Sequence, residues 1–267
     1  MSDDPKSTPP ATALQHVPAT NTLALQSSRS GIIARGRRDA ATAATNPHYQ
    51  QAVADYAAGN LTAAAQRFQQ AAEQGHAESQ YILSTLYDTG EGLPQDNAQS
   101  ALWERRAAEQ GHAHAQANLS FRYYSAGDFA AAFTWCQRAA HSNLPWAQYN
   151  LGLMFRKGEG VPQSDTEAAH WYRRAALQDF PEAQQKLADL YTFGHGVPLN
   201  LKQAAIWYRR AADNGNAEAQ FQLAHLYATG QGVDPDYTLS RHWIRQAANQ
   251  GHQQAQQELK RREYRDP

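Results

Sequence analysis

Tryptophan recurs along this chain at a nearly constant spacing, and this repeat restricts the fold more than any other feature. Five of the six tryptophans are separated by 32, 36, 36 and 36 residues. A leucine precedes each of them in register, an aromatic residue follows that leucine by four positions, and two alanines follow each tryptophan. The columns are Trp103, Trp135, Trp171, Trp207 and Trp243; Leu83, Leu119, Leu151, Leu187 and Leu223; Tyr87, Tyr123, Phe155, Tyr191 and Tyr227; and the alanine pairs that begin at Ala107, Ala139, Ala175, Ala211 and Ala247. Such columns indicate a repeat architecture, in which stacked copies of one unit share a continuous core.

Each repeat is predicted to fold as two helices joined by a loop that contains glycine. In the fourth unit, the helices are expected at about 146–156 and 165–177, with apolar residues four apart on the inner stripe of each. Gly158 and Gly160 end the first helix, because glycine takes the left-handed conformation that a helix end needs. Asp165 is the expected N-cap of the second helix.

The predicted fold is therefore an all-α, right-handed α-solenoid of about five to six helix-pair repeats with a C-terminal capping helix and no β-sheet. The solenoid is expected to span 47–267. Its repeats are expected at about 47–76, 77–112, 113–144, 145–180, 181–216 and 217–252, and the cap at 253–267. The first pair of helices, about Tyr49–Tyr56 and Leu61–Glu73, is less regular, and Gln253–Tyr264 is a single extra helix.

The repeated unit closely resembles the Sel-1-like repeat, a relative of the tetratricopeptide repeat. The best match is Pro181–Asn216, which carries Ala183-Gln184, Leu187, Tyr191, Gly194-His195-Gly196-Val197-Pro198, Ala204, Trp207-Tyr208 and Ala211-Ala212. The resemblance covers about Ala77–His252, and the unit 113–144 departs from it by losing four residues of its loop. The resemblance implies a scaffold or adaptor role, as in bacterial signalling, envelope assembly, host interaction or protein quality control.

Residues 1–46 lie outside the resemblance and are predicted to form a disordered tail. They are rich in Ala, Thr, Ser and Pro and show no apolar periodicity, so they cannot bury enough apolar surface to offset the entropy of the chain. A small basic cluster surrounds Ile32 and Ile33 and consists of Arg29, Arg35, Arg37 and Arg38. It is read as a plain linker, with a docking peptide or a non-classical secretion signal as the alternatives.

Composition limits the classes of partner and compartment. The net charge is −1 and the pI is about 6.8, which gives no reason to expect a nucleic acid as partner. No apolar run of roughly 18 residues exists, so no membrane insertion is expected. No signal peptide is seen, which predicts a cytoplasmic protein; the alternative is a periplasmic or secreted one, if the true start lies upstream or a non-classical signal is used.

No residue set in the sequence points to a catalytic, cofactor or metal site. His76, His112 and His252 occupy one repeat position, which explains them better than metal ligation does. The single cysteine, Cys136, lies beside a column tryptophan and is predicted to be a buried structural thiol. Arginine pairs recur at Arg105-Arg106, Arg173-Arg174 and Arg209-Arg210, and are read either as a solvated helix face or as a basic ladder for an acidic partner.

The partner-binding surface is predicted on the concave groove lined by the first helix of each repeat. The groove positions lie two before, two after and five after each column leucine. They are Tyr81, Thr85 and Asp88; Ala117, Phe121 and Tyr124; Tyr149, Leu153 and Arg156; Gln185, Asp189 and Thr192; and Phe221, His225 and Ala228. Exposed aromatic residues have a cost unless a partner covers them, and the alternative is that some tilt into the core between repeats.

The predicted function is a non-enzymatic protein–protein interaction module that binds a peptide or protein segment in this groove, centred on the repeats at 77–180. The alternatives are a small-ligand binder or hydrolytic enzyme that uses the same groove, or a secreted effector or host-interaction factor. An enzyme would need acid, base and nucleophile on adjacent first helices. The sequence places only Asp189 and His225 at equivalent positions on neighbouring repeats.

Overall fold

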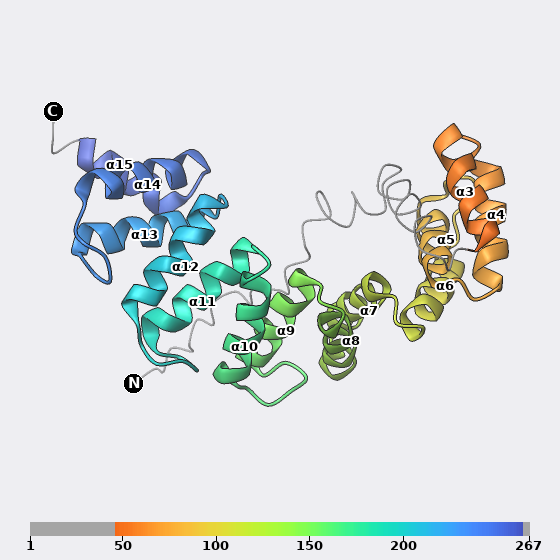
Figure 1. The fold of residues 1–267 in the computed structure, drawn as a ribbon, viewed down its shortest axis with the longest axis horizontal. Coiled ribbons are helices and arrows are strands. Elements are labelled where there is room, and N and C mark those ends of the chain that lie inside the picture. The colour runs from red at the N-terminus through yellow and green to blue at the C-terminus, as the bar shows by residue number, and fades with distance from the viewer. Residues whose placement is uncertain (1–45, 264–267) are drawn as a thin grey trace, which may run out of the picture. The chain divides into compact units, whose positions relative to one another are not determined.

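The computed structural model describes residues 46–263, and this part of the chain is entirely helical, without a strand (Figure 1). The predicted tail, apart from Asn46, and the last four residues lie outside the described part. The helices are α3 (Pro47–Ala58), α4 (Leu61–Glu73), α5 (Ala77–Thr89), α6 (Asn97–Glu109), α7 (Ala113–Ser125), α8 (Phe129–His141), α9 (Pro145–Lys157), α10 (Asp165–Ala176), α11 (Pro181–Phe193), α12 (Leu201–Asp213), α13 (Ala217–Thr229), α14 (Tyr237–Asn249) and α15 (Gln253–Glu263). None of them is both long enough and apolar enough to cross a bilayer.

The chain forms two compact units that divide between Ala139 and Ala140. In the N-terminal unit, each helix from α3 to α7 packs against the next helix along the chain. The same holds in the C-terminal unit from α9 to α15. Consecutive packing of helix pairs is what a solenoid requires, because neither helix of a pair buries its apolar stripe alone. The predicted all-α helix-pair solenoid is confirmed.

The caps of the helices differ in detail from the sequence prediction. The N-cap of α10 is Ser164 and not Asp165: its backbone is extended, and its hydroxyl oxygen accepts the Glu167 N–H at 3.2 Å. Asp165 instead begins the helix and forms an ion pair with Arg156. Asn46, which was assigned to the tail, is the N-cap of α3, because its side-chain oxygen accepts the His48 N–H at 2.9 Å.

Five tryptophans of the repeat column are buried, as predicted, and arginines complete their packing. In the arginine pairs, the second member lies over the ring of its own tryptophan, as Arg210 does over Trp207 with 4.7 Å between guanidinium carbon and ring centroid. The first member reaches the next repeat, as Arg173 does by donating to the Tyr191 hydroxyl at 2.7 Å. The arginine pairs therefore hold each repeat to its tryptophan and to its neighbour.

A column of glutamine amides joins successive repeats. The glutamine near the start of each first helix donates from Nε2 to the carbonyl oxygen of the second alanine of the preceding pair, as Gln184 does to Ala176 at 3.1 Å. Its Oε1 accepts from the C-cap residue of the following second helix, as from Asn214 at 3.2 Å. The equivalent glutamines are Gln80, Gln116, Gln148, Gln220 and Gln256. The amides of Gln80, Gln148, Gln184 and Gln220 are buried, and each of these four satisfies polar groups of two neighbouring repeats.

The second glycine of the loop motif allows one repeat to approach the next. A Cβ at Gly196 would overlap the backbone of Asp165, at the start of the second helix in the preceding repeat. Gly232 would meet the backbone of Leu201 in the same way. The backbone at both glycines has a positive φ, so a side chain there would be strained even without the overlap.

Candidate functional site

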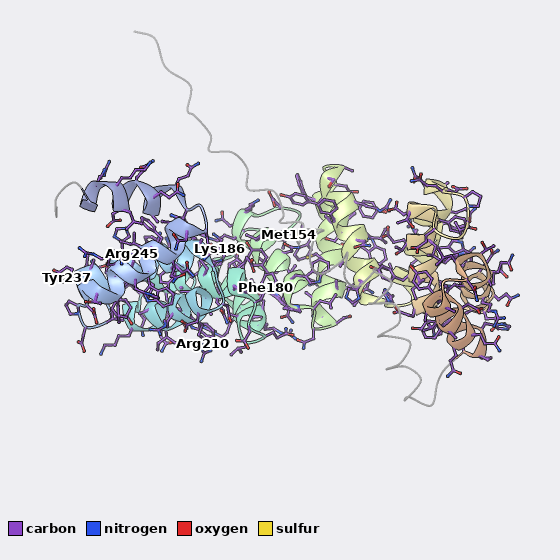
Figure 2. All side chains as sticks on the ribbon, turned by 90° about the horizontal axis from the view of Figure 1, so that it is seen from above. Met154, Phe180, Lys186, Arg210, Tyr237 and Arg245 are labelled. Atoms are coloured by element: carbon purple, nitrogen blue, oxygen red, sulfur yellow. The ribbon has the colours of Figure 1, made fainter. Side chains whose placement is uncertain are left out.

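The predicted groove positions separate into a buried column and two partly exposed columns. The residues two before each column leucine are all buried: Tyr81, Ala117, Tyr149, Gln185 and Phe221. Three of them pack on the residue that precedes the first helix of the next repeat. Tyr81 stacks on His112 with ring centroids 4.4 Å apart, and Phe221 lies 4.6 Å from His252. Tyr149 lies 5.5 Å from Phe180, which is labelled in Figure 2.

This buried column corrects part of the groove prediction, because its members are packing residues between repeats. The buried residue and the residue that precedes the next first helix also correspond in type. An aromatic residue at the first of these positions faces a ring at the second, whereas Gln185 at the first corresponds to Asn216 at the second. Sequence spacing alone could not reveal this, since a residue two before the leucine lies between the inner and the outer face of the helix. The signal that identifies the column is the pairing of residue types between repeats.

The column histidines cap helices and connect repeats. His112, the N-cap of α7, accepts the Ala115 N–H on Nδ1 at 3.2 Å, and its Nε2 lies 2.9 Å from the Glu78 carboxylate on α5, the first helix of the repeat before α7. His252 does the same with Ala255 and with Glu218, at 3.0 Å for the carboxylate contact. Within residues 46–263, no group of three or more His, Cys, Asp or Glu residues could hold a metal ion.

The two remaining columns supply the accessible side chains of the first helices. Asp88 and His225 are exposed, Leu153 is buried, and the others are half-buried. The half-buried residues are Thr85, Phe121, Tyr124, Arg156, Asp189, Thr192 and Ala228. Phe121 and Tyr124 belong to the N-terminal unit, and Leu153 and Arg156 to the C-terminal unit. The expectation that binding centres on 77–180 therefore draws on both units and stays a prediction.

Asp189 and His225, the only candidate acid and base on neighbouring repeats, have separate partners. Asp189 accepts from the Tyr208 hydroxyl and from Gln185 Nε2, both at 2.6 Å. Burial raises the pKa of Asp189, although these hydrogen bonds and Lys186 oppose the shift. His225 Nε2 lies 3.6 Å from the Glu258 carboxylate on α15. Both residues thus serve contacts between helices, which explains their positions without catalysis.

The residue that follows each column tryptophan is buried, and this column carries the most unusual polar groups. Tyr172 occupies this position one repeat before Tyr208, and its ring lies against Gly152, where a Cβ would overlap it. Its first helix offers Leu153 where the next repeat offers Asp189, so the Tyr172 hydroxyl is buried without a hydrogen-bond partner among the described residues.

The same column holds a buried carboxylate and the single thiol in the N-terminal unit. Glu104 is 3% exposed, lies 2.8 Å from Arg122 Nε and accepts from Asn118 Nδ2 at 2.9 Å. Burial raises the pKa of Glu104 despite Arg122. Cys136 is buried, as predicted, and burial raises its pKa to about 12, so the thiol stays protonated. Glu104 was not anticipated, because its only sequence signal is a charge in an otherwise uncharged column.

Comparison with known proteins agrees with this geometry. A solved structure of a protective antigen from uropathogenic Escherichia coli, described as displaying an SLR fold, is 33% identical with a TM-score of 0.69; the match covers 88% of this chain and 48% of that one. A Sel1 repeat protein from Oxalobacter formigenes is 29% identical with a TM-score of 0.69, over 74% of this chain and 84% of that one.

A curated relative is the chitin synthase regulator SKT5 of Saccharomyces cerevisiae, 31% identical over 102 residues. This match covers 36% of this chain and 15% of the relative. The chain thus spans about half the length of the E. coli antigen and a smaller part of the yeast protein. The Sel1 repeat matches residues 60–76, 77–112, 113–144, 147–180, 181–216 and 217–252. With six such matches over most of its length, this chain belongs to the Sel1 repeat family.

Proposed function

We propose that this chain is a non-enzymatic interaction module that binds a peptide or protein segment along the accessible side of its first helices. The observation that carries the proposal is a contrast between two sets of positions. The buried columns of leucine, tryptophan and paired alanine repeat the same residue types from unit to unit, whereas the positions two and five after the column leucine do not.

The accessible positions change in size, charge and polarity from one repeat to the next. The successive pairs are Thr85 and Asp88, Phe121 and Tyr124, Leu153 and Arg156, Asp189 and Thr192, and His225 and Ala228, and of these residues only Leu153 is buried. A scaffold needs constant residues where repeats stack and is free to vary elsewhere. Accessible side chains that differ from repeat to repeat can recognise a partner segment whose own side chains differ along its length.

The relatives support a role that operates through another protein. The yeast relative is named a regulator of an enzyme, chitin synthase. In this chain, Asp189 and His225 are each engaged with a neighbouring helix, and this favours the interaction module over a hydrolytic enzyme in the same groove.

The test begins with an affinity pull-down using the full chain as bait, followed by calorimetry with the captured partner. Phe121→Ala and Arg156→Ala should each weaken binding by about 1–3 kcal/mol while the helical content stays intact. Gln66→Ala, an exposed residue on the second helix α4, serves as the control and should leave binding unchanged. Tyr149→Ala is unsuitable, because Tyr149 is buried between Tyr172 and Phe180. Unchanged affinity in both test variants, with folding intact, would refute this site.

A further inference from the structure

The last two complete repeats separate charge between their first and second helices. The second helices are basic: α12 carries three basic residues and one acidic residue, and α14 carries two basic residues and no acidic one, so each has a net charge of +2. The first helices are acidic: α11 carries two acidic residues and one basic residue, and α13 carries one acidic residue, so each has a net charge of −1. The whole chain is nearly neutral, so this separation is local.

Part of the positive charge on the second helices already forms contacts within the fold. Arg209 forms an ion pair with Asp213 at 3.0 Å, and its guanidinium lies over the Trp243 ring at 5.2 Å. This contact also joins α12 to α14, the second helices of consecutive repeats. Lys202, Arg210 and Arg245 are exposed, and none forms an ion pair with a carboxylate within residues 46–263; Figure 2 labels the last two.

An exposed aliphatic side chain lies among these cations. Ile206 is 47% exposed and is four residues from both Lys202 and Arg210, so the three share one stripe of α12. A solvated helix face has no need of isoleucine at the centre of its stripe. Cations on both sides of an exposed apolar side chain match a segment that presents acidic and aliphatic residues together.

We propose that the exposed sides of α12 and α14 form a second interaction surface, which binds an acidic segment of a partner protein that also carries aliphatic side chains. This surface consists of Lys202, Ile206 and Arg210 on α12 and Arg245 on α14. It is separate from the accessible side of the first helices.

A polypeptide fits this surface better than a nucleic acid does. Tight nucleic-acid binding needs many phosphate contacts, and the surface offers three cations beside two acidic helices. Bases also bind by stacking on arginine planes or aromatic rings. The guanidinium of Arg210 already lies on Trp207, whose ring is buried, so that ring and the arginine face against it are not open to a base.

The test measures fluorescence anisotropy with the full chain and a labelled synthetic helical peptide of glutamate and leucine. Arg210→Glu/Arg245→Glu should weaken binding about tenfold or more, because two attractive contacts become repulsive. The matched control is Lys260→Glu/Arg261→Glu on α15, which reverses two exposed charges away from the surface. Circular dichroism verifies that both variants keep their helices.

Each other outcome has a defined meaning. Ile206→Ala should weaken binding of the glutamate–leucine peptide but not of a peptide whose leucines are replaced by glutamine, and this difference supports the aliphatic part of the proposal. The proposal fails if the wild-type chain does not bind the peptide. It also fails if the two double variants lose affinity equally, or if a single-stranded oligonucleotide binds more tightly than the peptide.

Discussion

At the scale of single residues, the position after each column tryptophan determines how polar the core is. Glu104, Cys136, Tyr172, Tyr208 and Ile244 occupy it in successive repeats. Each side chain is buried, so its polar atoms depend on what the adjacent first helices offer, which belong to the same repeat for Tyr172 and Tyr208 and to the following repeat for Glu104. Tyr208 has an acceptor in Asp189, Glu104 has Arg122 and Asn118, and Tyr172 has none among the described residues.

Removing the hydroxyl should lower the free energy of unfolding at Tyr208 but not at Tyr172. Tyr208→Phe removes a donor from a buried carboxylate and should cost about 1–3 kcal/mol in the free energy of unfolding. Tyr172→Phe removes a hydroxyl that is buried without a partner, so it should be neutral or slightly stabilising. Urea unfolding of both variants provides the comparison. Equal losses in the two would mean that Tyr172 has a partner of equal value.

Glu104 should make the N-terminal unit less stable as the pH rises. Burial raises its pKa in the folded state, so the folded chain binds this proton more tightly than the unfolded chain does. The free energy of unfolding therefore rises as the pH falls through the folded pKa towards the unfolded value, about 4.3. Asp88 adds to the shift and Arg122 opposes it.

Glu104→Gln provides the measurement, because it removes the charge and keeps an oxygen for Asn118. Its stability relative to the wild type should be greatest at neutral pH and should decline near the unfolded pKa, as followed by urea unfolding at both pH values. Glu109→Gln is the control, since Glu109 is exposed and pairs with Arg105 along one helix. A difference for Glu104→Gln that does not change with pH would contradict the argument.

At the scale of helices and loops, the second loop glycine controls how closely two repeats approach. Gly196→Ala should cost more than Gly215→Ala, although both glycines have a positive φ. Each substitution adds backbone strain of about 1 kcal/mol or more. Only the Gly196 Cβ also overlaps the backbone of Asp165, whereas the Gly215 Cβ would lie in open space. Thermal unfolding of the two variants tests this, and equal losses would show that the loop moves aside at no cost.

The elements could be predicted from sequence closely, and their exact ends could not. Periodic apolar residues and loop glycines place both helices of the fourth unit within a residue or two of α9 and α10. The cap of α10 was wrong because Ser164 and Asp165 are both good N-cap residues, and only the backbone conformation distinguishes them. The glutamine column was recognised as part of a motif, but its two-sided hydrogen bonding depends on helices that are distant in sequence.

The candidate site was less predictable than the fold, for a physical reason. Helical periodicity tells which residues face inward within one helix pair, but the burial of Tyr81, Tyr149 and Phe221 arises from the following repeat. Charge separation between first and second helices was visible in the sequence only after each helix had been delimited. The arginine pairs are visible in the sequence, but their two roles are visible only in the folded chain. The second arginine of a pair covers its own tryptophan, and the first one contacts the next repeat.

At the scale of the whole molecule, stability should be local, because each repeat contacts mainly its neighbours. Trp171→Ala should cost about 3–5 kcal/mol, since the ring is buried and packs with His141, His170 and Arg174. Amide hydrogen exchange should accelerate most in α9 to α12 and least in α3 and α4.

The equivalent substitution in the other unit is the control for this locality. Trp103→Ala should accelerate exchange in α4 to α6 instead, because Trp103 on α6 packs with Ala72 on α4 and Leu83 on α5. Uniform acceleration over residues 46–263 in both variants would show one cooperative unit in place of local coupling. A loss below about 1 kcal/mol for Trp171→Ala would show that the ring is dispensable to packing.

The glutamine column bears on how a chain of this kind changes its length. Gln148, Gln184 and Gln220 make the same bonds to the repeat before and to the end of the second helix in their own repeat. An in-frame duplication of one such segment would therefore supply a matching donor and acceptor at each new junction. A gene encoding it could gain or lose whole units by unequal recombination without disturbing the junctions that remain, and the duplicated outer residues could then diverge towards new ligands.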